Sequence, residues 1–267
     1  SKWLKLANSV KLRLAMRICY VKPDLAKQYA MEAVRDGVME TADDSALFQS
    51  WGSITIINPL EKIWNGYSDT RMGASMDSYL NGYNDPRLPV YFQPVTEGDN
   101  KGEYRGVANG MPNPQQDDYK AMSAPNVQEK STDSPLRWMM ASEVAFLRAE
   151  GAMRGWTAEM GGTAEEFYNK GIELSFLENG LSADAAARYA ADETSKPTDF
   201  TDVSTANTKY NISALGKITI KWNAGASEEE QLERIITQKW IAMFPNGTEA
   251  WSEFRRTGYP LIFPVRS

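Results

Sequence analysis

The sequence predicts a mostly α-helical protein built from helical hairpins, with a long irregular region and little strand. Apolar residues recur at helical spacing within residues 1–37, and they do so again within 141–176 and 227–257. In residues 41–140 this spacing is lost. Of the 267 residues 42% are hydrophobic and 24% charged, as in ordinary globular proteins, and we treat residues 1–267 as one domain with an irregular insertion at about 41–140.

The first predicted helix lies at the start of the chain. Five apolar residues share one of its faces, at spacings of four, three, four and four: Trp3, Ala7, Val10, Leu14 and Ile18. Pro23 and Asp24 then begin a second helix, and Gly37 lies near its end. Because only a few residues separate the two helices, we expect them to form an antiparallel hairpin.

A second hairpin is predicted from residue 141 onward. Ala145, Ala149 and Ala152 lie on one stripe of its first helix, where small side chains let helices approach closely. Thr163 and Glu166 form a capping box that begins the next helix. Two helices joined by a short turn, with alanines at the contact, are typical of tetratricopeptide-like repeats. The two hairpins share no obvious consensus, so a regular array is not predicted from the pattern alone.

The last third of the chain contains three more predicted helices. A short one covers 183–191 with Ser182 as its cap, and a capping box at Ser227 and Glu230 begins the longest one. Pro245, Asn246 and Gly247 break that helix, and a final helix runs over 248–256.

The stretch 238–260, QKWIAMFPNGTEAWSEFRRTGYP, is interpreted as a packed helical corner. Its aromatic residues recur at helical spacing and are expected to face one interface: Trp240, Phe244 and Trp251. Arg255 and Arg256 lie in the last turn, where they offset the partial charge of the helix C-terminus and can pair with Glu249 or Glu253. The corner is therefore predicted to supply packing rather than a binding site.

Composition excludes several classes of function. The sequence has no histidine, which rules out Ser-His-Asp and Cys-His catalytic units and His-ligated metals. Cys19 is the only cysteine, so neither an internal disulfide nor a thiolate metal cluster can form. The net charge of −6 and the lack of a long basic run argue against a nucleic-acid partner. We expect no catalytic residue, no metal, no cofactor and no enzyme activity.

The irregular region carries the candidate binding site. Gly, Pro, Asn and Asp crowd together there, and eight aromatic residues lie between positions 51 and 104. Aromatic rings can stack on the apolar faces of sugars while Asn, Asp and Arg bond to the hydroxyl groups. The candidate glycan-binding residues are Trp51, Trp64, Tyr67, Tyr83 and Tyr104. The competing interpretation is that most of these rings anchor the region onto the helical body.

Several segments resemble the SusD/RagB-like outer-membrane proteins of Bacteroidetes. The C-terminal stretch ERIITQKWIAMFPNGTEAWSEFRRTGYP (233–260) carries the strongest likeness. Further matches occur in the order seen in the family: ANSVKLRLAMRI at 7–18, NDPRLPVYF at 84–92, SEVAFLRAEGAMRGW at 142–156 and FYNKGIELSF at 167–176. They are most similar to the SusD-like branch, which is described as starch-binding and associating with the outer membrane.

The resemblance implies a cell-surface lipoprotein that takes part in nutrient uptake. A tetratricopeptide-like scaffold would carry irregular loops that bind glycan, and the protein would deliver this ligand to a SusC-like TonB-dependent transporter. The anchor cysteine of the family is absent, since Cys19 lies in the middle of a helix, and family members are longer. We therefore expect a portion of a longer lipoprotein, held at the outer membrane only by a lipid anchor absent from this chain.

Two alternatives to glycan binding stay open at this point. One is a peptide-binding uptake component of the RagB type. The other is a helical-repeat module for protein interaction, without a small ligand of its own. An acidic, aromatic-lined cleft in region 51–119 would favour glycan, and an exposed groove rich in backbone donors and charged pockets would favour peptide. A loop folded flat on the helices, with every aromatic ring buried, would favour the interaction module.

Overall fold

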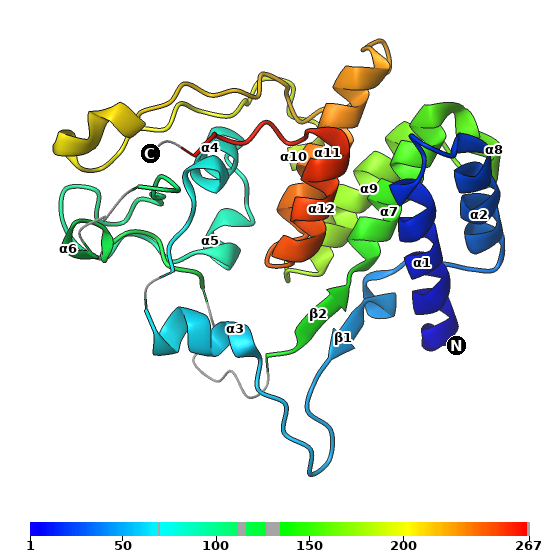
Figure 1. Cartoon of the computed structure of the whole chain (residues 1–267), viewed down its shortest axis with the longest axis horizontal. Helices are drawn as coiled ribbons and strands as arrows, with labels where there is room; N and C mark the ends of the chain where they lie inside the picture. Colours follow the sequence, from blue (N-terminus) through cyan, green and yellow to red (C-terminus); the bar gives the residue numbers. More distant parts are fainter. Residues whose placement is uncertain (69, 112–115, 127–133, 266–267) are drawn as a thin grey trace. The chain divides into compact units, whose positions relative to one another are not determined.

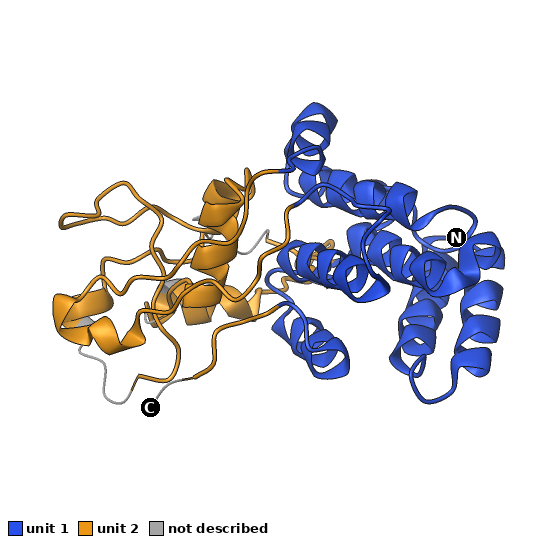
Figure 2. Cartoon of the chain, turned by 90° about the horizontal axis from the view of Figure 1, so that it is seen from above, with its two compact units in different colours: residues 1–47, 137–193, 220–260 blue, residues 48–136, 194–219, 261–267 orange. Residues whose placement is uncertain are grey.

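The computed structural model describes residues 1–68, 70–111, 116–126 and 134–265. It divides into two compact units, shown in two colours in Figure 2. Unit 1 comprises residues 1–47, 137–193 and 220–260, and unit 2 comprises 48–136, 194–219 and 261–267. The mostly helical fold with little strand is confirmed, because the described residues form a single two-stranded sheet among many helices. The predicted insertion at about 41–140 corresponds to most of unit 2, which also takes in residues 194–219.

Unit 1 consists of helical hairpins, visible in Figure 1. The helix α1 packs on α2 and α7, and α7 packs in turn on α9 and α11. The sheet pairs β1 with β2. The bounds are α1 (Lys2–Arg17), α2 (Pro23–Arg35), β1 (Ala46–Phe48), β2 (Leu136–Met139), α7 (Ala141–Gly151), α8 (Thr157–Met160), α9 (Ala164–Leu177), α10 (Ala183–Ala190), α11 (Glu228–Ala242) and α12 (Gly247–Thr257).

The predicted helix starts are confirmed by their caps. The side chains of Thr163, Ser182 and Ser227 each accept a hydrogen bond from a backbone N–H three residues further on. Thr163 and Glu166 complete the predicted capping box. None of the helices in the described ranges combines the length and apolar character that a membrane span requires.

The face of α1 that packs into the core of unit 1 differs from the face predicted from the apolar spacing. Leu12, Ala15 and Met16 are buried against α2 and α7, whereas Trp3 and Leu14 are exposed. Two polar residues share the buried side. Asn8 donates to the carbonyls of residues 36 and 37 at 2.9 and 2.8 Å, and Ser9 accepts from the Met39 N–H at 3.0 Å. Because Asn8 and Ser9 are polar, the buried face of α1 cannot be recognised from hydrophobic spacing alone.

The corner at 238–260 is a helical turn between α11 and α12, but its packing differs from the expectation. Trp251 is 56% exposed and stacks on Phe254 with ring centroids 5.6 Å apart, so it does not enter the core. Glu249 and Glu253, on the opposite side of α12, are buried in ion pairs. The predicted pairing of Arg256 with Glu253 is present, at 2.6 Å.

Unit 2 is largely irregular, with short helices joined by turns and isolated bridges. The helix α4 packs so closely on residues 196–198 that only glycine fits at position 82. Asp85 and Arg87, on either side of Pro86, form a fully buried ion pair at 2.7 Å. The helices here are α3 (Pro59–Glu61), a π-helical turn η2 (Lys62–Gly66), α4 (Ala74–Gly82), α5 (Leu88–Tyr91), α6 (Gln116–Tyr119) and a 3₁₀ helix η5 (Thr205–Tyr210).

Candidate functional site

The five aromatic residues predicted as a binding site all lie in unit 2, but their exposure differs greatly. Trp51 is 80% exposed and Tyr67 is 60% exposed. Trp64 and Tyr104 are half-buried. Tyr83 is 1% exposed. Trp51, Trp64 and Tyr67 belong to one continuous stretch of chain, whereas Tyr83 and Tyr104 lie elsewhere in the sequence of the unit.

Trp51 is held on a tight turn. Its backbone exchanges two hydrogen bonds with Ile54, each of 3.0 Å, which closes a two-residue hairpin loop. Gly52 has a φ of 59°, the left-handed conformation that glycine adopts without steric cost. Ser50 secures the base of the loop, because its hydroxyl accepts from the Ile56 N–H at 2.9 Å. The indole is thus exposed on a loop whose backbone is fixed by its own hydrogen bonds.

Trp64 and Tyr67 lie in and directly after the π-helical turn η2, which follows α3. Asn58 caps α3 by accepting from the Leu60 N–H at 3.1 Å, and the chain then continues as the π-helical turn η2. The Tyr67 N–H donates to the Lys62 carbonyl at 3.1 Å, and the Lys62 ammonium lies 5.8 Å from the centroid of the Tyr67 ring. Single π-helical turns are frequent at functional sites. Here the turn places an exposed phenol next to a cation.

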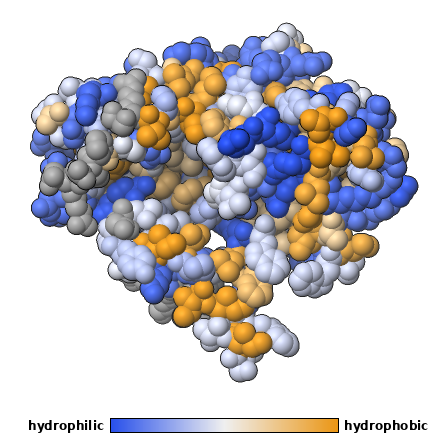
Figure 3. Space-filling model, viewed as in Figure 1, coloured by the Kyte–Doolittle hydropathy of each residue, from blue (hydrophilic) through white to orange (hydrophobic). Residues whose placement is uncertain are grey.

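Exposed aliphatic residues accompany these aromatics. We define the apolar segment as residues 48–67, in which six apolar side chains are exposed: Phe48, Trp51, Ile54, Ile57, Ile63 and Tyr67. Figure 1 shows its first part as a loop that runs out from β1 before the chain reaches α3, and Figure 3 shows hydrophobic side chains gathered there. Contiguous apolar surface on a folded protein marks an interaction site more often than chance. The sequence singles out only the aromatic members, because an isoleucine looks the same in a sequence whether it is exposed or buried.

Tyr83 serves the core of unit 2 instead. Its ring meets that of Tyr79 edge-on, with centroids 5.8 Å apart, and its hydroxyl donates to the Ile218 carbonyl at 3.3 Å. A ring enclosed in this way has no open face on which a sugar could stack. We therefore leave Tyr83 out of the proposed site. Tyr104 stays a candidate, with its carbonyl accepting from the Asn81 amide at 2.9 Å.

A polar cluster elsewhere in unit 2 has a structural role. The Tyr119 hydroxyl donates to Asp202 at 3.0 Å and accepts from the Asn207 amide at 2.7 Å. Burial, together with the neighbouring Asp202 carboxylate, raises the pKa of Tyr119 to about 12. Tyr119 is therefore a neutral hydrogen-bond donor at physiological pH, which ties α6 to the segment around residue 202.

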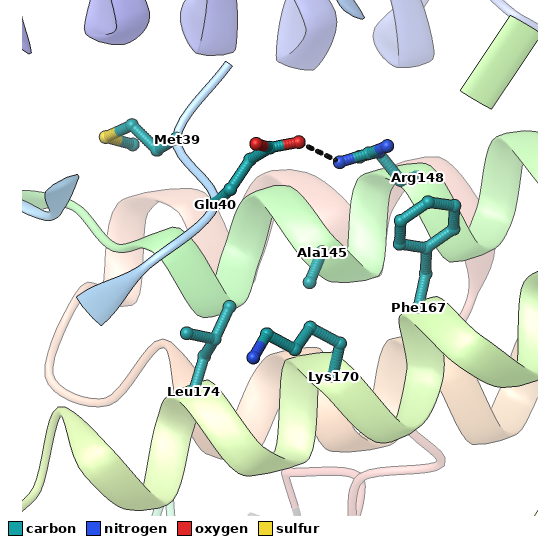
Figure 4. A pocket seen from close by; sticks show the side chains of 7 residues that line it. All are labelled: Met39, Glu40, Ala145, Arg148, Phe167, Lys170 and Leu174. Atoms are coloured by element: carbon teal, nitrogen blue, oxygen red, sulfur yellow. Dashed lines mark hydrogen bonds and ion pairs between the residues drawn. The ribbon is translucent and has the colours of Figure 1, made fainter. Parts of the chain in front are cut away.

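Unit 1 contains two hollows formed by its helices. The smaller, of about 250 Å³, is shown in Figure 4. Its main polar side chain is Arg148, which pairs with Glu40 at 2.8 Å, donates twice to the Met160 carbonyl and lies 4.0 Å from the centroid of the Phe167 ring. These contacts brace α7 against α8 and α9. A wider groove of about 800 Å³ runs between α9 and α10. Neither hollow includes a predicted site residue.

Comparisons with known proteins point to one family. The family model described as "SusD-like: Susd and RagB outer membrane lipoprotein" matches residues 1–267. A chitin-binding SusD homolog from Flavobacterium johnsoniae is similar at 43% identity and a TM-score of 0.90, over 99% of this chain and 52% of its own. No curated protein sequence matches the chain.

Two further solved structures are similar to the same extent. A SusD-like protein from Bacteroides thetaiotaomicron has 46% identity and a TM-score of 0.89, over 99% of this chain and 54% of its own. A SusD homolog from Bacteroides vulgatus has 37% identity and a TM-score of 0.89, over 100% and 52%. The chain thus spans about half the length of the solved structures it matches.

Proposed function

The chain belongs to the SusD-like family, and from this premise we propose that it captures glycan at the outer-membrane surface without altering it chemically. The observation that carries the proposal is the apolar segment, where Trp51 and Tyr67 expose their rings on turns with a well-defined backbone. Trp64 and Tyr104 stay candidates for further contacts.

The exposed rings account for binding in simple physical terms. The C–H face of a pyranose covers an indole as an apolar surface would, and burial of about 100 Å² contributes roughly 2.5 kcal/mol at about 25 cal/mol per Å². That energy corresponds to a change in Kd of roughly 70-fold. Because the Trp51 loop is closed by its own hydrogen bonds, little conformational entropy is lost when a ligand binds.

Delivery to a SusC-like TonB-dependent transporter completes the proposal. Ile54 and Ile57 are exposed beside Trp51, and aliphatic side chains suit a protein surface better than the hydroxyl-rich edges of a sugar. In the proposed arrangement the rings hold glycan and the aliphatic residues contact the transporter, with the protein held at the outer membrane by a lipid anchor outside residues 1–267. The same aliphatic residues are what would favour a peptide ligand, which is the second candidate.

Four buried glutamates are held in ion pairs of the helical scaffold. Glu143, Glu150, Glu249 and Glu253 each lie within ion-pair distance of arginine or lysine. We expect no shorter products when the protein is incubated with chitooligosaccharides. Release of shorter oligosaccharides, lost on mutation of a carboxylate pair, would overturn this part of the proposal.

Affinity measurements on the protein as the cell produces it test glycan capture. Chitohexaose is the first probe because the Flavobacterium relative is described as chitin-binding, and maltohexaose and a peptide mixture are the comparison ligands. We expect Trp51→Ala to weaken glycan binding about 10- to 100-fold, from the energy estimated for the indole.

Trp251→Ala is the matched control, since it removes another exposed indole from unit 1. We expect it to leave the affinity unchanged. Equal affinities of Trp51→Ala and the unmodified protein would refute the assigned site. Binding of peptides but of no glycan in the panel would replace glycan capture with the second candidate.

A further inference from the structure

A single cation accompanies the exposed aromatic rings of the apolar segment. Lys62 is exposed, and its ammonium lies 5.8 Å from the centroid of the Tyr67 ring. Residues 48–67 contain no other cationic side chain and only one acidic side chain, that of Glu61. An ordinary solvated surface mixes charges of both signs, whereas this one is apolar around one cation.

The π-helical turn η2 brings Lys62 and Tyr67 together. The Tyr67 N–H donates to the Lys62 carbonyl at 3.1 Å, a bond between residues five positions apart. In a regular α-helix the side chains three and four residues apart are neighbours, so the wider π-helical turn is what aligns positions 62 and 67. The attraction between an ammonium and an aromatic face then favours the observed arrangement.

The Lys62 ammonium is available to a ligand. Among the residues that the structure describes, no carboxylate forms an ion pair with it. Other exposed lysines of the chain do form such pairs, as Lys221 does with Glu193 at 2.8 Å. The adjacent Glu61 lies in the first turn of α3, and helical residues one position apart do not face each other.

A cation beside an aromatic ring selects for charge on a sugar. A pyranose that stacks on the exposed part of Tyr67 carries its substituents at the edge of the sugar ring, within reach of the ammonium. A hydroxyl in that position accepts an ordinary hydrogen bond from Lys62. A carboxylate or sulfate oxygen accepts a charge-assisted hydrogen bond, which is roughly twice as strong.

We propose that the apolar segment prefers glycans that carry an anionic group, either the carboxylate of a uronic acid or a sulfate ester. Lys62 pairs with this group while Tyr67 holds the sugar ring. The inference rests on the proposed glycan-binding function and names the class of glycan. The net charge of −6 repels anions at long range, so a preference for them has to come from a local cation.

Affinities for matched pairs of oligosaccharides test the proposal on the protein as the cell produces it. A hyaluronan hexasaccharide carries carboxylates and no sulfate, and its carboxyl-reduced form is the neutral match. A keratan sulfate hexasaccharide carries sulfates and no carboxylate, and its desulfated form is the neutral match. We expect at least one anionic form to bind about 3- to 10-fold more tightly than its match at low salt. In about 1 M salt, where the Debye length is about 3 Å, the difference should largely disappear.

Substitutions of Lys62 identify the cation responsible. We expect Lys62→Gln to bring the ratio of the anionic to the neutral affinity to about one, and Lys62→Arg to retain the preference. Lys101→Gln is the matched control, because it removes an exposed lysine from another part of unit 2, and it should leave the ratio unchanged. An anionic preference that survives in Lys62→Gln would overturn the proposal.

The outcomes separate this inference from the proposed function. Tighter binding within the hyaluronan pair alone would assign a carboxylate to the ligand, and within the keratan pair alone a sulfate. Equal affinities within both pairs, or no binding of either anionic form, would overturn the preference. In that case, binding of chitohexaose or maltohexaose that weakens in Trp51→Ala would leave glycan capture standing. Failure of every glycan to bind would overturn both.

Discussion

Replacing Glu253 with glutamine should destabilise unit 1 far more than the small change in shape suggests. Glu253 is buried on α12, and its carboxylate meets three cations, Arg17 at 2.6 Å, Arg256 at 2.6 Å and Lys239 at 3.1 Å. Lys239 is itself fully buried, and among the described residues its ammonium has no hydrogen-bond partner. Glutamine keeps the shape of the side chain but leaves these cations with one counter-ion fewer.

The magnitude follows from Coulomb's law and the cost of burial. Unit charges about 3 Å apart attract by roughly 5 kcal/mol at an effective dielectric constant of about 20, and desolvation cancels much of this. Removing one partner of a buried pair costs about 3–5 kcal/mol, because the remaining charge stays buried. We expect Glu253→Gln to lower the free energy of unfolding by that amount, or the Tm by roughly 6–20 °C.

The assay is urea unfolding at pH 7 followed by far-ultraviolet circular dichroism, which reports on the long helices of unit 1. Glu193→Gln is the control, since it removes a carboxylate that pairs with Lys221 at 2.8 Å on the surface, and we expect no measurable change. Combining Glu253→Gln with Lys239→Met should recover part of the loss, because it removes one surplus cation. A Glu253→Gln variant within about 1 kcal/mol of the unmodified protein would refute the reasoning.

The remaining predictions concern pH and packing. Burial alone would raise the pKa of Asp44, but hydrogen bonds from Lys5 and the backbone lower it to about 2, so its stabilising effect is present above about pH 4 and is lost as the pH falls toward 2. The difference in urea midpoint between Asp44→Asn and the unmodified protein should therefore shrink across that window, and a constant difference would contradict the assignment. Gly82→Ala should cost about 1–3 kcal/mol in the same assay, because the added Cβ would overlap the Lys196 carbonyl oxygen, whereas Gly225→Ala has room and should have little effect.

Most of unit 1 could be predicted from the sequence because its signals are local. The helices α9 and α11 each begin at a capping residue, Thr163 or Ser227, whose hydroxyl accepts from the backbone N–H of a glutamate three residues later. These contacts lie within one turn of the chain. The core face of α1 could not be predicted in the same way. Asn8 and Ser9 are buried there only because they bond to the end of α2 and the residues after it, about 30 positions away in sequence. The helix α4 could not be predicted in the same way, because it packs through Gly82 on segment 196–198, more than 100 positions away in sequence.

The candidate site shows the same division between local and distant causes. The irregular region and its aromatic residues were evident from composition, and the Trp51 turn is closed by contacts within a few residues. Exposure could not be predicted, because Tyr83 is buried by groups such as the Ile218 carbonyl, 135 positions away. From the sequence alone, Ile54 and Ile57 would be assigned to the hydrophobic core. Their exposure adds two aliphatic side chains to the apolar segment that contains Trp51 and Tyr67.

The corner at 238–260 places several charged side chains in the interior of unit 1. Glu249 and Glu253 lie four residues apart on α12 and meet arginines of α1, while Arg256 pairs with Glu150 of α7. These contacts join helices that are more than 100 positions apart in sequence. We propose that charge pairing fixes the relative rotation of these helices more strictly than aliphatic packing would. If this is their role, replacing all members by apolar residues of similar volume should preserve stability yet broaden the side-chain resonances of unit 1 in NMR spectra. A redesigned corner with sharp, unchanged resonances would show that packing alone specifies the scaffold.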